Sequence, residues 1–149
     1  QHGYNFRLDE IRSAMGLSQI KKLHEWNKKR NNAAKYYTNN LKSINGIETP
    51  LYVPVSEKHS WHLYVIKIKN SFGLTRNNLF KKLLEQGIRT SVHYKPLHNF
   101  SLYQKKAKSF SSLKNSSEVY TEVLSLPLYP DISKKEQDFV ISKIKHLQK

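Results

Sequence analysis

The chain has 149 residues, of which 38% are hydrophobic and 11% aromatic, so it can form a folded core and is not a disordered polyelectrolyte. It contains no cysteine, which excludes disulfides and thiolate metal sites and agrees with a reducing, cytoplasmic location. The formal net charge of +15 comes from 26 Lys and Arg against 11 Asp and Glu, but the cations are scattered along the chain. A solvated basic surface is therefore favoured over nucleic-acid binding, with room for a local anion site.

A long helical segment is predicted over residues 8–43. Its apolar residues recur at three- and four-residue spacing: Leu8, Ile11, Met15, Leu17, Ile20, Leu23, Trp26, Ala33, Tyr37, Leu41 and Ile44. A single helix of that length is unusual in a globular domain, so we expect a break near Leu23–His24 and two helices. Asn45 and Gly46 then end the second helix.

Two strands are predicted further along the chain. The segment WHLYVIKIK (61–69) is rich in β-branched and aromatic residues, and IRTSVHY (88–94) is a second strand. Between them, Thr75 is placed to cap a helix that Gly87 ends. The segment GIETPLYVP (46–54) is extended but interrupted by two prolines, and SLPLYP (125–130) forms another short extended piece.

The last part of the chain is mainly helical in this interpretation. Two weaker helices are predicted around residues 102–108 and 117–124. Ser133 and Glu136 form a capping box that opens a final helix, which places Val140, Ile144 and Leu147 on one face. No segment is long and apolar enough to cross a membrane, so no membrane partner is expected.

The order of these elements predicts an α+β fold. We expect a small mixed or antiparallel sheet with helices on one face, preceded by the broken helix pair. Residues 1–45 form a helical segment in this interpretation, and residues 46–149 form the small α+β domain. The helix pair carries more apolar surface than a small sheet can cover. Its side chains should therefore be exposed, at Leu8, Ile11, Leu17 and Ile20, and should favour association.

Two segments carry candidate functional residues. VHYKPLH (92–98) places His93 and His98 around Tyr94 and a proline, but it lacks a third ligand for a metal. A loop that lines a polar pocket is therefore the favoured interpretation. GYNFR (3–7) places Asn5 and Arg7 just before a helix N-terminus, where an anion is stabilised. When this segment is taken alone, plain helix entry, with Asn5 and Arg7 in a solvated turn, is the favoured interpretation.

Three stretches together resemble one family. GYNFRLDEIRSAMGLSQIKKLHEWNKKRNNAAKYY contains Gly-Tyr-Asn-Phe-Arg before a helix, HLYVIKI is followed by GIRTSVHYKPLH, and LSLPLYPDISKKEQDFVISKI closes the chain. These stretches resemble, in the same order, segments of the DegT/StrS-type sugar-nucleotide aminotransferases. The resemblance covers almost the whole chain. It implies the C-terminal portion of a fold type I enzyme that depends on pyridoxal 5'-phosphate (PLP).

The resemblance also implies an activity. Such enzymes transfer an amino group from glutamate or glutamine to a keto sugar nucleotide, usually for polysaccharide biosynthesis, and we expect a homodimer. In the family, the Schiff-base Lys and the acid that holds the pyridinium nitrogen lie upstream, around a Gly-Glu-Gly-Gly element. No matching element occurs here. No catalytic residue is therefore assigned, and the chain alone is predicted to be inactive.

Five binding residues follow from the same resemblance. Asn5 matches the family Asn that reaches the cofactor phosphate of the neighbouring subunit, and Arg7 lies near the same site. His93, Tyr94 and His98 match a loop that lines the substrate side, so they are predicted to contact the nucleotide sugar. Two alternatives stay open. One is a non-catalytic truncated remnant, and the other is a basic nucleic-acid-binding domain that rests on the net charge alone.

Overall fold

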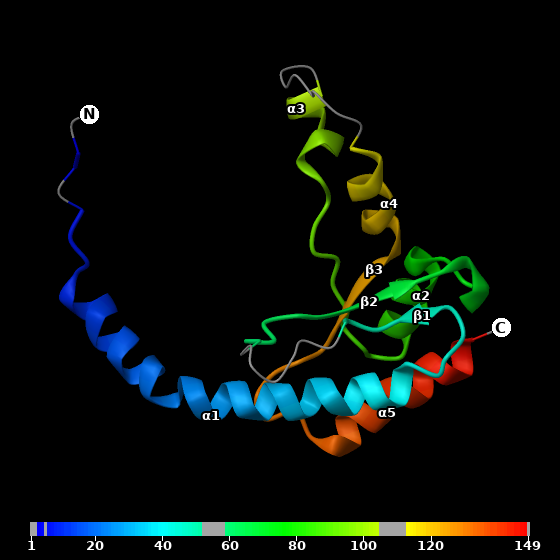
Figure 1. Cartoon of the computed structure of the whole chain (residues 1–149), viewed down its shortest axis with the longest axis horizontal. Coiled ribbons are helices and arrows are strands. Elements are labelled where there is room, and N and C mark those ends of the chain that lie inside the picture. Colours follow the sequence, from blue (N-terminus) through cyan, green and yellow to red (C-terminus); the bar gives the residue numbers. More distant parts are fainter. Residues whose placement is uncertain (1–2, 5, 52–58, 105–112, 149) are drawn as a thin grey trace.

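The computed structural model describes residues 3–4, 6–51, 59–104 and 113–148. Figure 1 shows a long helix that extends beyond a small helix-and-sheet body. The elements in these ranges are α1 (Glu10–Leu41), β1 (Ile47–Glu48), β2 (Tyr64–Ile68), η1 (Asn70–Phe72), α2 (Arg76–Glu85), η2 (Leu97–Asn99), α3 (Ser101–Gln104), α4 (Lys114–Glu122), β3 (Val123–Leu126) and α5 (Lys134–Leu147). None of the helices described, α1 included, combines the length and the apolar character needed to cross a bilayer.

The sheet has three antiparallel strands in the order β1-β2-β3. Tyr64, Ile66 and Ile68 of β2 alternate with half-exposed neighbours, so they point to one face of the sheet. On that face they join buried residues of α1, α2 and α5 in one hydrophobic core. The predicted α+β fold with a small antiparallel sheet is therefore confirmed, and the helices of the core cover one face of that sheet.

The core depends on large side chains that α1 and β2 contribute. Tyr37 of α1 and Tyr64 of β2 are fully buried, and their ring centroids lie 5.2 Å apart. The Tyr64 hydroxyl lies 2.8 Å from Oγ1 of Thr38, and burial raises the pKa of Tyr64 to about 12. A buried polar contact joins the two long helices, because Nε2 of Gln137 donates to the Ala33 carbonyl at 2.9 Å.

The predicted break at Leu23–His24 is wrong. α1 is one 32-residue helix, and Figure 1 shows it changing direction along its length without interruption. Neither a proline nor a glycine occurs near Leu23, so no residue there ends the helix. Packing of its C-terminal half into the core stabilises a helix that local propensity alone would leave marginal. The division into residues 1–45 and 46–149 stays a prediction.

The second predicted strand, residues 88–94, is also wrong in extent. Only Ser91 pairs, through two backbone hydrogen bonds of 3.1 and 2.8 Å with Ser125 of β3. The chain then leaves the sheet and continues as the loop that contains η2. Strand propensity reflects how well a side chain packs on a half-buried pleated surface. Because β3 has only four residues, it offers little such surface to residues 88–94, and most of them do not pair.

The predicted end of the first helical segment at Asn45 and Gly46 is wrong, because α1 ends at Leu41 with Lys42 as its C-cap, and Gly46 instead forms the turn before β1, where its backbone lies against Phe72. Two predicted helix starts are confirmed. The Thr75 side chain accepts a hydrogen bond from the Asn78 backbone at the start of α2, and Ser133 with Glu136 forms the capping box of α5. α4 begins three residues earlier than the predicted helix at 117–124 and ends at Glu122. Of the predicted helix at 102–108, residues 102–104 lie in α3, while 105–108 lie outside the described residues. The predicted exposure of Leu8, Ile11, Leu17 and Ile20 is confirmed.

A pair of glycines provides a test of the local backbone. Gly46 and Gly87 have nearly the same positive φ, 77° and 78°, but a Cβ on Gly46 would lie 2.1 Å from the Phe72 backbone nitrogen. Gly87 has open space at that position. We expect Gly87→Ala to lower the free energy of unfolding by about 1–2 kcal/mol, from the left-handed backbone alone. Gly46→Ala should lower the free energy of unfolding by about 1–3 kcal/mol more than Gly87→Ala does, because the added methyl group would collide with the Phe72 backbone. Urea unfolding of both variants checks this, and equal losses would contradict it.

Candidate functional site

An open pocket of about 490 Å³ lies between α4 and the loop that follows Ser91. Val123 of β3 forms part of its floor, and Val123 pairs with Lys67 of β2. Leu124, the next residue, belongs to the core. Because successive strand residues face opposite sides, Val123 and Ser125 point away from the helices of the core. The pocket therefore occupies the other face of the sheet. Its lining residues are His93, Tyr94, Lys95, Pro96, Leu97, Asn115, Ser116, Val119, Tyr120 and Val123.

His93 holds the start of the loop to the sheet. Its Nδ1 lies 2.9 Å from Oγ of Ser125. Its ring also contacts Tyr94 edge-on, with the ring centroids 4.6 Å apart. Tyr94 is 73% exposed, so its ring stands at the mouth of the pocket with little protein cover. The structure thus brings together two of the predicted site residues, His93 and Tyr94.

His98 contacts α4, and its role at the substrate stays a prediction. Its Nε2 lies 2.9 Å from Oγ of Ser117 on α4, and the residue is not among those that line the pocket. The loop is therefore tied at two points, to β3 through His93 and to α4 through His98. Figure 1 shows the loop and α4 rising side by side from the sheet toward α3.

The far wall of the pocket consists of residues that sequence reasoning missed. Asn115, Ser116, Val119 and Tyr120 are spaced one, three and one residues apart, which places them on one face of α4. That spacing was visible in the sequence, but only the fold brings this face against the loop. Lys95 was also missed. Its ammonium lies 4.8 Å from the centroid of the Phe100 ring, a cation–π contact that orders the loop.

The last turn of α4 is held by a buried arginine. Arg76 of α2 is only 7% exposed, its Nη2 donates to the Tyr120 carbonyl at 2.9 Å, and its guanidinium lies 5.1 Å from the Tyr120 ring. Its Nε has no hydrogen-bond partner among the described residues. A cation at a helix C-terminus also suits the helix dipole. Arg76 therefore positions Tyr120, a lining residue, without reaching the pocket itself.

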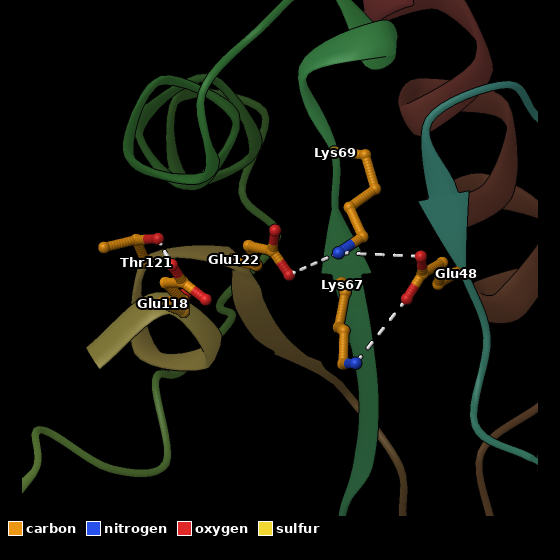
Figure 2. A network of polar contacts seen from close by, with 6 residues as sticks. All are labelled: Glu48, Lys67, Lys69, Glu118, Thr121 and Glu122. Atoms are coloured by element: carbon orange, nitrogen blue, oxygen red, sulfur yellow. Dashed lines mark hydrogen bonds and ion pairs between the residues drawn. The ribbon is translucent and has the colours of Figure 1, made fainter. Parts of the chain in front are cut away.

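A second contact fixes α4 to the sheet, on the face that carries the pocket. Figure 2 shows Nζ of Lys69 between Glu122, at the end of α4, and Glu48 of β1. The distances from Nζ are 2.7 Å to Glu122 and 3.5 Å to Glu48, which also lies 3.5 Å from Nζ of Lys67. The hydrogen bond to Glu122 raises the pKa of Lys69 above its ordinary value. These pairs are partly exposed, so they orient α4 more than they stabilise the fold.

The pocket can accept a ligand with both charged and ring-shaped parts. Lys95 offers a cation, and Asn115 and Ser116 offer hydrogen-bonding groups at the first turn of α4. The N-cap residue, Leu113, forms no side-chain capping hydrogen bond within the described part of the chain, and backbone N–H groups at a helix start favour an anion. Tyr94 offers a ring face. Within the described ranges, no group of three or more His, Asp or Glu residues could hold a metal ion.

Comparison with known proteins now decides the family. Residues 1–145 match the model of the DegT/DnrJ/EryC1/StrS aminotransferase family. The chain belongs to this family. It is 34% identical over 150 residues to the spore coat polysaccharide biosynthesis protein SpsC of Bacillus subtilis. It is also 37% identical over 131 residues to a Helicobacter pylori enzyme, UDP-4-amino-4,6-dideoxy-N-acetyl-beta-L-altrosamine transaminase.

The solved structures give the same family. The chain superimposes on Helicobacter pylori PseC, an aminotransferase involved in the biosynthesis of pseudoaminic acid, with a TM-score of 0.83 and 30% identity. That match covers 99% of this chain and 39% of PseC. The match to SpsC covers 99% of this chain and 38% of SpsC. The match to the Helicobacter pylori transaminase covers 88% of this chain and 34% of that enzyme. The chain thus spans little more than a third of the DegT-family relatives that it matches.

Of the two cofactor-binding residues predicted from the DegT-family resemblance, only Arg7 falls within the described residues. Asn5 lies outside the described residues. Arg7 is exposed, in the segment before α1, and Figure 1 shows that segment far from α3 and from α4, which lines the pocket. Asp9 caps α1, because its side chain accepts a hydrogen bond from the Arg12 backbone at 2.9 Å. One copy of the chain therefore keeps Arg7 and the pocket apart.

The role of Arg76 in this DegT-family chain can be tested. Arg76→Ala removes the donor to the Tyr120 carbonyl and the stem beneath the Tyr120 ring. We expect the free energy of unfolding to fall by about 2–4 kcal/mol and hydrogen exchange of the α4 amides to accelerate. Arg89→Ala is the matched control, since Arg89 is exposed, and it should change stability by less than about 0.5 kcal/mol. Unchanged exchange in α4 would refute the positioning role.

Proposed function

We propose that this chain is the C-terminal part of a PLP-dependent aminotransferase that acts on a keto sugar nucleotide, with glutamate or glutamine as the amino donor. The observation that carries the proposal is the pocket built on the His93–His98 loop, the loop that the family resemblance assigns to the substrate side. Family membership over residues 1–145 and the names of the relatives, which are sugar aminotransferases, support the reaction class.

The pocket suits the two parts of a nucleotide sugar. A diphosphate would meet Lys95 and the first turn of α4, since both favour negative charge. A base or sugar ring would stack on the exposed ring of Tyr94. His93 holds Tyr94 in place and keeps Nε2 free of any partner among the described residues, so it can bond to the substrate. His98 acts through Ser117, by holding α4 against the loop.

The sequence of this chain offers groups for only one part of PLP, its phosphate. When bound, PLP supplies an electron-withdrawing ring that makes amino-group transfer feasible. Arg7 carries a guanidinium, which suits a phosphate, and Asn5, two positions earlier in the sequence, carries an amide. No lysine in this chain lies in a context that matches the cofactor anchor. We therefore assign the covalent chemistry to the other part of the complete enzyme. The isolated chain is expected to show no turnover. Turnover of a keto sugar nucleotide by the pure chain would contradict this.

The complete enzyme is proposed to work as a homodimer. The segment before α1, to which Arg7 belongs, lies far from α3 and α4 (Figure 1). In a homodimer, Asn5 and Arg7 can serve the site of the neighbouring subunit instead. In this arrangement, Asn5 and Arg7 of one subunit and the His93–His98 loop of the other can serve the same active site.

Binding to the pocket can be tested on the chain itself with UDP-N-acetylglucosamine as the probe. We expect the probe to shift the amide NMR signals of residues 93–97 and 115–120. Tyr94→Ala should weaken binding about 5- to 150-fold, as expected for loss of a stacking ring worth about 1–3 kcal/mol. Tyr4→Ala replaces an equally exposed tyrosine far from the pocket and should leave the affinity unchanged. Shifts confined to other residues would contradict the assignment.

Cofactor binding requires the complete aminotransferase. There, Asn5→Ala should weaken retention of PLP about 10-fold or more, since a hydrogen bond to a charged group contributes about 1.5–3 kcal/mol. Cofactor absorbance after dialysis measures the retention. Asn32→Ala, at an exposed position of α1, is the control and should retain the wild-type amount. Unchanged retention in Asn5→Ala would remove Asn5 from the site.

A further inference from the structure

Ser125 is a polar residue within the buried strand β3. Only 5% of its surface is exposed, and all four residues of β3 are buried. Its backbone N–H and carbonyl are both paired with Ser91, at 2.8 and 3.1 Å. The side-chain hydroxyl therefore needs a partner of its own, because buried polar groups in folded proteins are hydrogen-bonded. Within the described part of the chain that partner is Nδ1 of His93, which lies 2.9 Å from Oγ.

The burial of Ser125 sets the direction of this hydrogen bond. A neutral imidazole carries its proton on one ring nitrogen, and the other nitrogen accepts. If Nδ1 of His93 carried the proton, it would donate to Oγ and leave the proton of the buried hydroxyl without an acceptor, at a cost in stability. If the hydroxyl donates to Nδ1 instead, both groups are satisfied. The second arrangement places the imidazole proton of His93 on Nε2.

Nε2 is the nitrogen of His93 that remains for the pocket. His93 lines the pocket, and its Nε2 has no hydrogen-bond partner among the described residues. An Nε2–H group donates a hydrogen bond and does not accept one. The ligand atom that it meets is therefore an acceptor, such as an oxygen of a phosphate, carbonyl or hydroxyl group. The cation that Lys95 offers to the same pocket also suits an oxygen-rich ligand.

We propose that Ser125 is a positioning residue, which holds His93 in its Nε2–H form so that His93 donates a hydrogen bond to an oxygen of the bound substrate. This inference rests on the proposed function, which places a nucleotide sugar in the pocket. It adds which atom of His93 meets the substrate, and in which sense. In this arrangement His93 binds and orients the substrate, and Nε2 has no lone pair with which to remove a proton from it.

The second histidine of the loop provides a contrast. His98 also lies 2.9 Å from a serine hydroxyl, but the contact runs from Nε2 to Ser117, which is only half-buried. Ser117 lies on α4, where a serine hydroxyl can turn to a helix carbonyl or to solvent. Burial therefore does not set the direction of this bond. A single tautomer is expected at His93 and is not required at His98.

The tautomer can be measured without a ligand, from the nitrogen NMR signals of the imidazole rings in this chain. At about pH 9, histidine rings are neutral. A single tautomer gives widely separated signals for the two ring nitrogens, whereas exchange between tautomers brings them together. We expect a wider separation for His93 than for the exposed His24, with the proton of His93 on Nε2. A proton on Nδ1, or a separation equal to that of His24, would overturn the proposal.

Ser125→Ala removes the donor and should reduce the signal separation of His93 to that of His24. Thr90→Val is the matched control. Thr90 is also buried, three positions before His93, and its Oγ1 has no partner among the described residues. Its replacement removes a buried hydroxyl without removing a contact to His93, so the His93 signals should keep their separation. Equal changes in the two variants, or no change in Ser125→Ala, would count against the assignment.

A double-mutant cycle tests the role of Ser125 at the pocket, with UDP-N-acetylglucosamine as the probe. Ser125→Ala should weaken binding about 2- to 10-fold, the equivalent of one ordinary hydrogen bond. In a His93→Ala background the same substitution should have no further effect, because Ser125 acts through His93. Equal losses in both backgrounds would show that the hydroxyl only stabilises the sheet and would overturn the proposal.

Inorganic pyrophosphate as a second probe locates the oxygen. If Ser125→Ala weakens the binding of both probes, His93 donates to the diphosphate. If only UDP-N-acetylglucosamine is affected, His93 donates to the sugar or the base. A wild-type chain that binds neither probe would overturn the proposed function and the substrate contact with it, whereas the nitrogen signals decide the pairing of Ser125 with His93 on their own. The two proposals can therefore fail separately.

Discussion

The alternation of side chains along β2 divides the molecule into two sides. Tyr64, Ile66 and Ile68 point to the helices and are fully or nearly fully buried, while Lys67 and Lys69 point to the other face. The apolar side gathers α1, α2 and α5 into one core. The other side stays open enough for charged contacts and for the pocket. A shift of the strand by one residue would exchange these two sets, so the register of β2 determines where a ligand can bind.

The pocket depends on how α4 is held, since α4 forms its far wall. Arg76 reaches the last turn from α2, Lys69 holds Glu122 from the position after β2, and His98 contacts Ser117 from the loop. These contacts come from segments far apart in the sequence. Each is modest in energy, but together they place Asn115 and Tyr120 opposite Tyr94. The candidate site is therefore a property of the packing between elements more than of any single motif.

α1 has two halves with different roles. The C-terminal half contributes Ala34, Tyr37 and Leu41 to the core, and it is tied to α5 through the contact of Gln137 with Ala33. The N-terminal half is uncovered and carries apolar side chains around most of its circumference. A helix that is apolar on several sides is typical of one that is enclosed by protein. This explains why one family member can combine a complete small core with a long unpacked helix.

The sequence alone determined the elements whose signals are local. The cap at Thr75, the capping box at Ser133 and the apolar strand around Ile66 each depend on residues close together in the chain, and each was predicted. The family, too, could be predicted from sequence, because the motifs that resemble the aminotransferases are short runs of neighbouring residues. The continuity of α1 and the loss of the strand at 88–94 were decided by tertiary contacts, because local propensity is small beside packing. The pocket, too, was decided by tertiary contacts. His93 and Tyr94 could be read from one motif, but Arg76, Asn115 and Tyr120 join them only because folding brings α2, α4 and the loop together.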